Sequence, residues 1–311
     1  MDIILIFIGF TFLTVGGHYV VQSAVSLSFK LNISKFVIGM TVVSFATSLP
    51  ELIVSINAAL NGSPSIALNN VIGSNIANIG LVLAFIAILG NISVEKNFYS
   101  RDWPWMFFIS VIAALLIYTD NNLTSIEGLV FLFLLLLFIY SVLKKRNLNE
   151  ISEEVDEKLI LVSYNKIFIW LIISSLALYY GSEFLIEGAV NLAKQFNISE
   201  AVISVTIIAV GTSIPELAAS VVALAKGEKG VSVGNLIGSN IFNIGSVLGI
   251  TAVIKNIPVA QEIIQRDIIW MLVFALLILL LSILPKKDKL SKYKGLIILV
   301  LYFIFIFQAF S

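Results

Sequence analysis

The chain has 311 residues, of which 59% are hydrophobic and 12% are charged, with 19 basic and 19 acidic side chains and no cysteine. Charged residues make up about a quarter of a typical soluble domain, so this composition indicates an integral membrane protein. The zero net charge argues against a nucleic-acid partner, and the missing cysteines exclude disulfides, thiolate metal sites and thiol catalysis.

Long apolar runs divide the chain into ten predicted membrane-spanning helices. A helix needs about 20 residues to cross roughly 30 Å of hydrocarbon. The expected spans are 3–29, 36–60, 65–90, 104–119, 123–143, 167–193, 201–225, 231–254, 268–284 and 295–310. The first run exceeds the core of a signal peptide and lacks a basic start, so we expect it to remain as the first helix.

Lysine and arginine are distributed unequally between the two sides of the predicted helices. Only Lys194, Lys255 and Arg266 fall on one side, and all the others lie in the loops of the opposite side. By the positive-inside rule the richer side is cytoplasmic. We therefore expect a multi-pass protein of the cell (plasma) membrane with both termini outside.

Two stretches, 32–80 and 197–245, repeat one another at a constant offset of 165 residues. The tripeptide Asn-Ile-Ser at 32–34 recurs at 197–199, and Gly-Ser-Asn-Ile at 73–76 recurs at 238–241. Because the register is constant and no insertion interrupts it, we interpret the stretches as two copies of one architecture.

Five predicted spans separate equivalent points of the repeat, and five is odd. The second copy must therefore cross the membrane in the opposite direction, which makes the fold class all-α with ten transmembrane helices in two inverted five-helix repeats. We place the first repeat at 1–146, a short cytoplasmic linker at 147–165 and the second repeat at 166–311. Inverted repeats are common in secondary transporters, which bind their substrate near the membrane midplane.

Each copy places one carboxylate inside an apolar span, Glu51 in the second and Glu216 in the seventh. An ionised side chain at the membrane centre costs about 2.5 to 3.5 kcal/mol on insertion scales, so such acids indicate a functional site. Ser44, Thr47 and Ser48 share the helical face of Glu51. Pro50 lacks an N–H, which frees a backbone carbonyl one turn back as a further oxygen donor.

Spans three and eight add hydroxyl and amide oxygens at Ser74, Asn78, Ser239 and Asn243. A site of oxygen donors alone suits hard cations such as calcium and sodium. No Asp lies in the middle of any span, which argues against an intramembrane aspartyl hydrolase, so we expect neither an enzyme nor a resident cofactor. Four other polar residues are interpreted as helix-packing contacts, namely Ser55, Asn75, Ser220 and Asn240.

Two motifs occur once in each copy: Thr-Ser-x-Pro-Glu, at 47–51 with Leu and at 212–216 with Ile as the third residue, and Gly-Ser-Asn-Ile-x-Asn, at 73–78 and 238–243. Together they resemble the two alpha-repeats of sodium/calcium exchangers in the calcium/cation antiporter superfamily. The resemblance covers all ten spans. It implies exchange of sodium for calcium across the cell membrane by alternating access, with calcium bound by Glu51 and Glu216. It assigns the surrounding sodium and calcium coordination to Ser44, Thr47, Ser48, Ser74, Ala209, Thr212, Ser213 and Ser239.

Two departures from the family narrow the prediction. Potassium-dependent members have an acid where this chain has Asn243, which argues against potassium co-transport. The loop between the repeats is too short for a calcium-sensing domain, so the chain resembles a minimal, prokaryotic-type exchanger. We expect its partners to be calcium and sodium ions and the lipid bilayer, with no obligate protein partner evident. A proton/calcium exchanger of the same superfamily, whose motifs typically read Gly-Asn-x-x-Glu, and a passive cation channel remain as alternatives.

Overall fold

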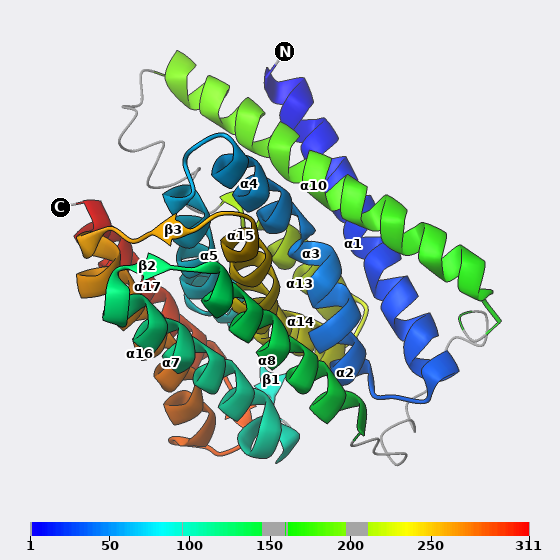
Figure 1. Cartoon of the computed structure of the whole chain (residues 1–311). Helices are drawn as coiled ribbons and strands as arrows, with labels where there is room; N and C mark the ends of the chain where they lie inside the picture. Colours follow the sequence, from blue (N-terminus) through cyan, green and yellow to red (C-terminus); the bar gives the residue numbers. More distant parts are fainter. Residues whose placement is uncertain (1, 95, 145–158, 160, 197–210, 311) are drawn as a thin grey trace. The chain divides into compact units, whose positions relative to one another are not determined.

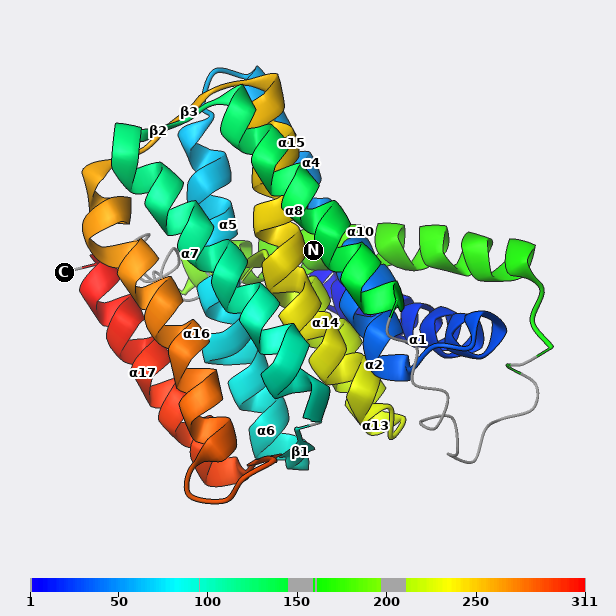
Figure 2. The same cartoon turned by 60° about the horizontal axis from the view of Figure 1, so that its bottom comes forward.

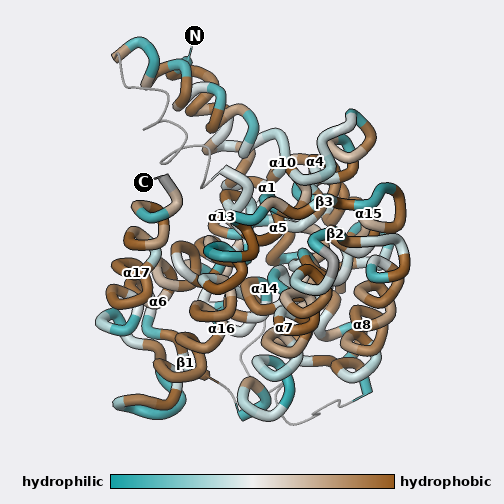
Figure 3. Tube along the Cα trace, turned by 60° about the vertical axis from the view of Figure 1, so that its left-hand side comes forward, coloured by the Kyte–Doolittle hydropathy of each residue, from teal (hydrophilic) through white to brown (hydrophobic). Residues whose placement is uncertain are grey.

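The computed structural model describes residues 2–94, 96–144, 159, 161–196 and 211–310. Within these ranges nine helices are long and apolar enough to cross a membrane. They are Asp2–Leu31, Lys35–Leu60, Ser65–Gly90, Phe98–Thr119, Ser125–Lys144, Tyr164–Gln195, Lys229–Ile254, Ile263–Ile283 and Lys292–Ala309. The seventh expected span, 201–225, is described only from residue 211, where it contains the shorter apolar helix Ile214–Ala225. Figure 3 shows hydrophobic residues along α8 (Ser125–Lys144), α16 (Ile268–Ile283) and α17 (Lys292–Phe310).

The fourth and ninth spans begin earlier than hydropathy predicts. Each starts with a π-helical segment, η3 (Phe98–Asp102) or η7 (Ile263–Asp267), which contains an Arg-Asp pair. The Arg101 Nε donates to Asp102 Oδ1 at 2.6 Å, and both side chains are buried. The prediction of loop residues here was wrong, because a hydropathy window counts both charges as polar although they neutralise one another inside the helix.

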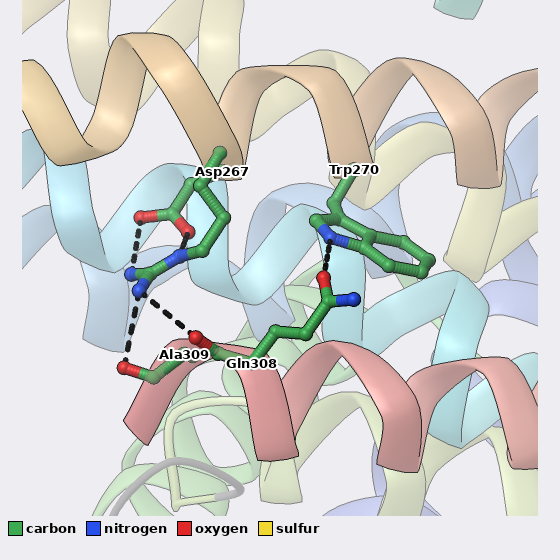
Figure 4. A network of polar contacts seen from close by, with 5 residues as sticks. Asp267, Trp270, Gln308 and Ala309 are labelled. Carbon is green, nitrogen blue, oxygen red and sulfur yellow. Dashed lines mark hydrogen bonds and ion pairs between the residues drawn. The ribbon is translucent and has the colours of Figure 1, made fainter. Parts of the chain in front are cut away.

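The second of these pairs also fastens one helix to the end of another. Arg266 binds Asp267 and donates to the backbone carbonyl of Ala309 at 3.1 Å, close to the C-terminus of α17. One turn further along, Trp270 Nε1 donates to Gln308 Oε1 at 3.0 Å (Figure 4). The guanidinium therefore satisfies terminal carbonyls that have no partner within the helix.

The chain forms two compact units, and each draws on both predicted repeats. Unit one comprises Met1–Leu49 and Lys145–Asn235, and unit two comprises Pro50–Lys144 and Leu236–Ser311. The chain passes from unit one to unit two between Leu49 and Pro50, and again between Asn235 and Leu236.

Unit one is built around two long helices, α1 (Asp2–Leu31) and α10 (Tyr164–Gln195), which run side by side (Figure 1). They approach closely through glycines, because a Cβ at Gly16 would lie 3.0 Å from the backbone nitrogen of Leu178 and one at Gly181 would lie 2.9 Å from that of Leu13. The unit also contains α2 (Lys35–Ile38), the π-helical segment η1 (Gly39–Val43), α3 (Ser44–Thr47), α13 (Ile214–Ala225) and the first half of α14 (Lys229–Phe242).

Unit two is a helical bundle (Figure 2). From the first repeat it contains α4 (Leu49–Leu60) from Pro50 onward, α5 (Ser65–Ala77), η2 (Asn78–Leu83), α6 (Ala84–Gly90), β1 (Ile92–Ser93), η3, α7 (Trp103–Asp120), β2 (Asn122–Leu123) and α8. From the second it contains the end of α14, η6 (Asn243–Leu248), α15 (Gly249–Ile254), β3 (Ile257–Pro258), η7, α16, β4 (Lys289–Leu290) and α17.

The bundle reproduces the sequence repeat in its irregular features. The π-helical segments η2 and η6 begin at Asn78 and Asn243, and η3 and η7 occupy matching positions further along each copy. Two short antiparallel pairs, β1 with β4 and β2 with β3, each join one copy to the other. Because π-helical turns are rare, their recurrence at one offset indicates that the two copies share a backbone design.

Candidate ion-binding site

In both copies the helix that carries the acid begins directly after a serine with non-helical backbone angles. Ser48, between α3 and α4, has φ −84° and ψ 1°, and Ser213, just before α13, has φ −92° and ψ 6°. These angles lie in the sparsely populated bridge region. Pro50 and Pro215 follow two residues later and lack the N–H that would continue the helix. The span expected as one helix at 36–60 therefore consists of separate helical segments.

This helix start makes each acid the third residue of its helix. Glu51 lies in the first turn of α4 and Glu216 in the first turn of α13, and both side chains are fully buried. The backbone N–H groups and the positive end of the helix dipole favour a negative charge at this position. A buried carboxylate in such a place is suited to bind a cation that enters the membrane.

The hydroxyls before Glu51 donate their protons to protein oxygens within unit one. Ser44 Oγ lies 2.9 Å from the carbonyl of Gly39 and 2.8 Å from that of Asn235. Thr47 Oγ1 lies 3.1 Å from Asn235 Oδ1. Thr47 Oγ1 also lies 3.3 Å from the carbonyl of Ser44. All these partners are acceptors, so each hydroxyl proton is directed toward the protein.

Two asparagines that the sequence analysis did not select have matching roles. Asn70 and Asn235 occupy equivalent positions of the repeat. Asn70 Nδ2 donates to Ser55 Oγ at 3.1 Å, and Asn235 Nδ2 donates to Ser220 Oγ at 3.2 Å. Asn70 also donates to the backbone carbonyl of Glu51 at 3.3 Å. Their matched position, four residues before Ser74 and Ser239, was the sequence signal that could have identified them.

Unit two holds a second group of amides. Asn75 Nδ2 donates to the backbone carbonyl of Asn240 at 3.2 Å, and Asn243 Nδ2 donates to Asn75 Oδ1 at 3.2 Å. Asn78 is fully buried, and neither atom of its amide has a hydrogen-bond partner among the residues that the structure describes. Asn78 and Asn243 each begin a π-helical segment, a feature that is frequent at functional sites.

The sequence-predicted residues fall into both units. Unit one holds Ser44, Thr47, Ser48, Thr212, Ser213 and Glu216, and unit two holds Glu51, Ser74, Asn78, Ser239 and Asn243. All are buried except Thr212, which is half-buried. Ala209 lies outside the described residues. The contacts of Ser55, Asn75 and Ser220 join separate helices, as the packing interpretation requires, whereas Asn240 Nδ2 donates to Leu236 of its own helix.

The donor atoms gathered here are carboxylate, hydroxyl and amide oxygens. Across the described ranges, no group of three or more His, Cys, Asp or Glu side chains could hold a metal ion. Zinc and copper sites usually need imidazole or thiolate ligands, whereas calcium and sodium prefer oxygen. The chemistry of both units therefore suits hard cations.

A family model described as "Sodium/calcium exchanger protein" matches residues 1–144 and 166–310. The inner membrane protein YrbG of Escherichia coli is 34% identical, over 89% of this chain and 87% of that protein. The sodium/calcium exchanger MaX1 of Methanosarcina acetivorans is 28% identical, over 98% of this chain and 97% of the exchanger.

Among solved structures, the sodium-calcium exchanger NCX_Mj soaked with zero Na+ and Ca2+ superposes with a TM-score of 0.81 at 30% identity, covering 99% of this chain and 98% of that chain. The predicted fold class, ten transmembrane helices in two inverted five-helix repeats, is thereby confirmed. The chain belongs to the sodium/calcium exchanger family.

Proposed function

We propose that Glu51 and Glu216 are the calcium-binding carboxylates through which this protein exchanges sodium for calcium. The protein is a multi-pass membrane antiporter, not an enzyme, and calcium and sodium are its transported ions. The observation that carries the site assignment is the repeated helix start after Ser48 and Ser213, which places a fully buried Glu in the first helical turn in both copies. Neither proton/calcium exchange nor a passive channel is favoured by the family relationship.

The remaining oxygen donors complete the proposed coordination. Carboxylates supply the charge that calcium requires, and neutral oxygens fill its remaining positions and those of sodium. We assign these neutral oxygens to Ser44, Thr47, Ser48, Ser74, Asn78, Thr212, Ser213, Ser239 and Asn243, and to the backbone carbonyl of Ala209.

The charge of the two carboxylates enforces exchange. With one calcium bound, the net charge of ions and carboxylates is zero, and with three sodium ions bound it is +1. Without bound ions, the two carboxylates would keep their negative charges while the protein changes between its outward-facing and inward-facing states. Two uncompensated charges in a low-dielectric environment are costly in free energy. Loaded states interconvert and the empty state does not, so each calcium that crosses is replaced by sodium.

The orientation is also part of the proposal: a plasma-membrane protein with both termini outside. Four lysines on the predicted cytoplasmic side lie over tyrosine or tryptophan rings, at 4.9 Å for Lys30 over Tyr164, 5.0 Å for Lys166 over Trp170, 5.6 Å for Lys144 over Tyr140 and 5.7 Å for Lys287 over Tyr99. Paired basic and aromatic side chains are typical of a membrane–water interface, and an excess of lysine is typical of its cytoplasmic side.

Uptake of calcium-45 into proteoliposomes tests the ion assignment. We expect uptake only when sodium is trapped inside and the outside solution is sodium-free. A proton gradient alone should give no uptake, and uptake driven by it would indicate proton/calcium exchange instead. Uptake that needs no counter-ion gradient would indicate a channel.

A further inference from the structure

Asn75 forms a chain of hydrogen bonds that ends at Asn243. It lies on α5, and its side chain is buried. Its Nδ2 donates to the backbone carbonyl of Asn240 at 3.2 Å, and its Oδ1 accepts from Asn243 Nδ2 at 3.2 Å. All three residues belong to unit two.

The chemistry of these groups fixes the direction of both amides. A backbone carbonyl can only accept, so the Asn75 nitrogen must face Asn240. The Asn75 oxygen must then face Asn243, and because this oxygen also only accepts, Asn243 must present its nitrogen. The Asn243 oxygen consequently lies at the opposite end of the amide group and is directed away from Asn75.

That oxygen is placed as an ion ligand would be. Asn243 is fully buried, and its Oδ1 has no hydrogen-bond donor among the described residues. A buried amide oxygen without a donor carries an unfavourable desolvation cost, which a cation would remove.

We infer that Asn75 is a positioning residue, which holds the amide of Asn243 so that its oxygen and not its nitrogen faces the transported ion. This inference rests on the proposed function, in which Asn243 is an ion ligand. An amide free to rotate would present its NH2 group part of the time and repel a cation. Fixing it beforehand removes the ordering cost of binding.

The hydrogen bonds of these amides differ between the two copies, although the copies have nearly the same sequence in this motif. Asn240 is the repeat counterpart of Asn75, but its Nδ2 donates to Leu236 of its own helix at 2.8 Å. Asn78 is the counterpart of Asn243, and within the described part of the chain its amide has no hydrogen-bond partner. The structure therefore fixes one of two equivalent ligand amides, and Asn240 provides a matched control for Asn75.

The test compares Asn75→Ala with Asn240→Ala in sodium-loaded proteoliposomes, with the half-saturating concentrations of sodium and calcium as readout. Both changes remove the same side chain at the same position of the motif. Loss of the hydrogen bond to Asn243 should raise the half-saturating concentration about three- to tenfold in Asn75→Ala, with little change in maximal rate per folded protein. Asn240→Ala should remain within about twofold of the wild type.

A double-mutant cycle then asks whether Asn75 acts through Asn243. Asn75→Ala should affect the same ion as Asn243→Ala and add nothing in an Asn243→Ala background. Additive effects, or equal effects of Asn75→Ala and Asn240→Ala, would overturn the inference in favour of packing. If Asn75→Ala does not fold, Asn75→Leu, which is nearly isosteric and apolar, replaces it throughout the cycle.

The same experiments separate this inference from the proposed site. Wild-type ion dependence in Asn243→Ala would remove Asn243 from the site, and the role of Asn75 with it. An impaired Asn243→Ala together with a wild-type Asn75→Ala would leave the site assignment intact and overturn only the positioning role.

Discussion

The side chains of Glu51 and Glu216 are fully buried, in contrast to that of Glu127 at the start of α8. Glu127 illustrates the difference, because its Oε2 accepts from the backbone nitrogen of Thr124 at 2.6 Å and caps the start of α8. That carboxylate has a structural use next to water. Glu51 and Glu216 are the carboxylates that we propose to bind the transported ions.

Replacing either buried acid with glutamine removes one of the two charges. We predict that Glu51→Gln and Glu216→Gln each lower calcium-45 uptake at least about a hundredfold, because calcium then lacks neutralising charge in a low-dielectric site. Elution of the purified variants as a single species will show that they fold. Glu127→Gln is the control and should transport normally. Normal calcium flux in either buried variant would disprove the assignment.

Asn235 Oδ1 accepts from the Thr47 hydroxyl at 3.1 Å, a shorter contact than the one of 3.3 Å to the Ser44 carbonyl. We predict that Asn235→Ala raises the half-saturating ion concentration about three- to tenfold, because the hydroxyl can then turn its proton toward the ion. Ser220→Ala removes the hydroxyl that accepts from Asn235 Nδ2 and should have a smaller effect. A larger effect of Ser220→Ala would mean that the contact with Thr47 is unimportant.

At the level of the helices, the interruption at Ser48 separates α3, which carries Ser44 and Thr47, from α4, which carries Glu51. In the second copy α13, which carries Glu216, begins directly after Ser213. The proline in each copy cannot donate to the carbonyl four residues before it, which is Ala46 in the first copy. That carbonyl remains available as an oxygen donor, as it is in the broken helices of other transporters.

Pro50→Ala should therefore weaken ion binding without destabilising the protein. The new N–H can donate to the Ala46 carbonyl and join α3 to α4, so we expect a several-fold rise in the half-saturating calcium concentration and an unchanged or higher melting temperature. Pro215→Ala is the equivalent change in the second copy. Unchanged calcium dependence in both variants would show that the interruption does not serve the site.

The sequence predicted the helices well because a helix in the hydrocarbon of the membrane must be apolar over about 20 residues, and hydropathy measures this property directly. It could not predict the early starts of two spans, since Arg101 and Asp102 look polar until their mutual neutralisation is seen. The motif residues were identifiable because Glu51 and Glu216 are costly in a membrane wherever they point. Asn75 and Asn235 were not, because an asparagine gains its role only from the groups that face it after folding.

For the whole molecule, the orientation in the membrane is open to direct test, and the absence of native cysteine leaves no background. Single cysteines at Asn61 and Asn121 should react with an impermeant thiol reagent added outside the cell, and one at Asn149 only after the membrane is opened. Asn61 and Asn121 are both exposed. Labelling of Asn149 in intact cells would reverse the proposed orientation.

Potassium should have no part in the exchange. Asn243 contributes an oxygen without charge, so the proposed site keeps the charge of two carboxylates and needs no further cation for balance. We predict that sodium-dependent calcium uptake is unchanged when potassium is replaced by choline at constant membrane potential. Stimulation by potassium would indicate a further acidic group at the site.

The contacts between the two copies are reciprocal. Gly16 meets Leu178 while Gly181 meets Leu13, and Asn75 binds Asn240, its own counterpart. Such contacts are those of identical subunits about a two-fold axis. A half-length ancestor inserted in both orientations would pair with itself through the same side chains. Within one chain the two copies need not stay identical, and Asn75 and Asn240 already differ in the groups to which their amides donate.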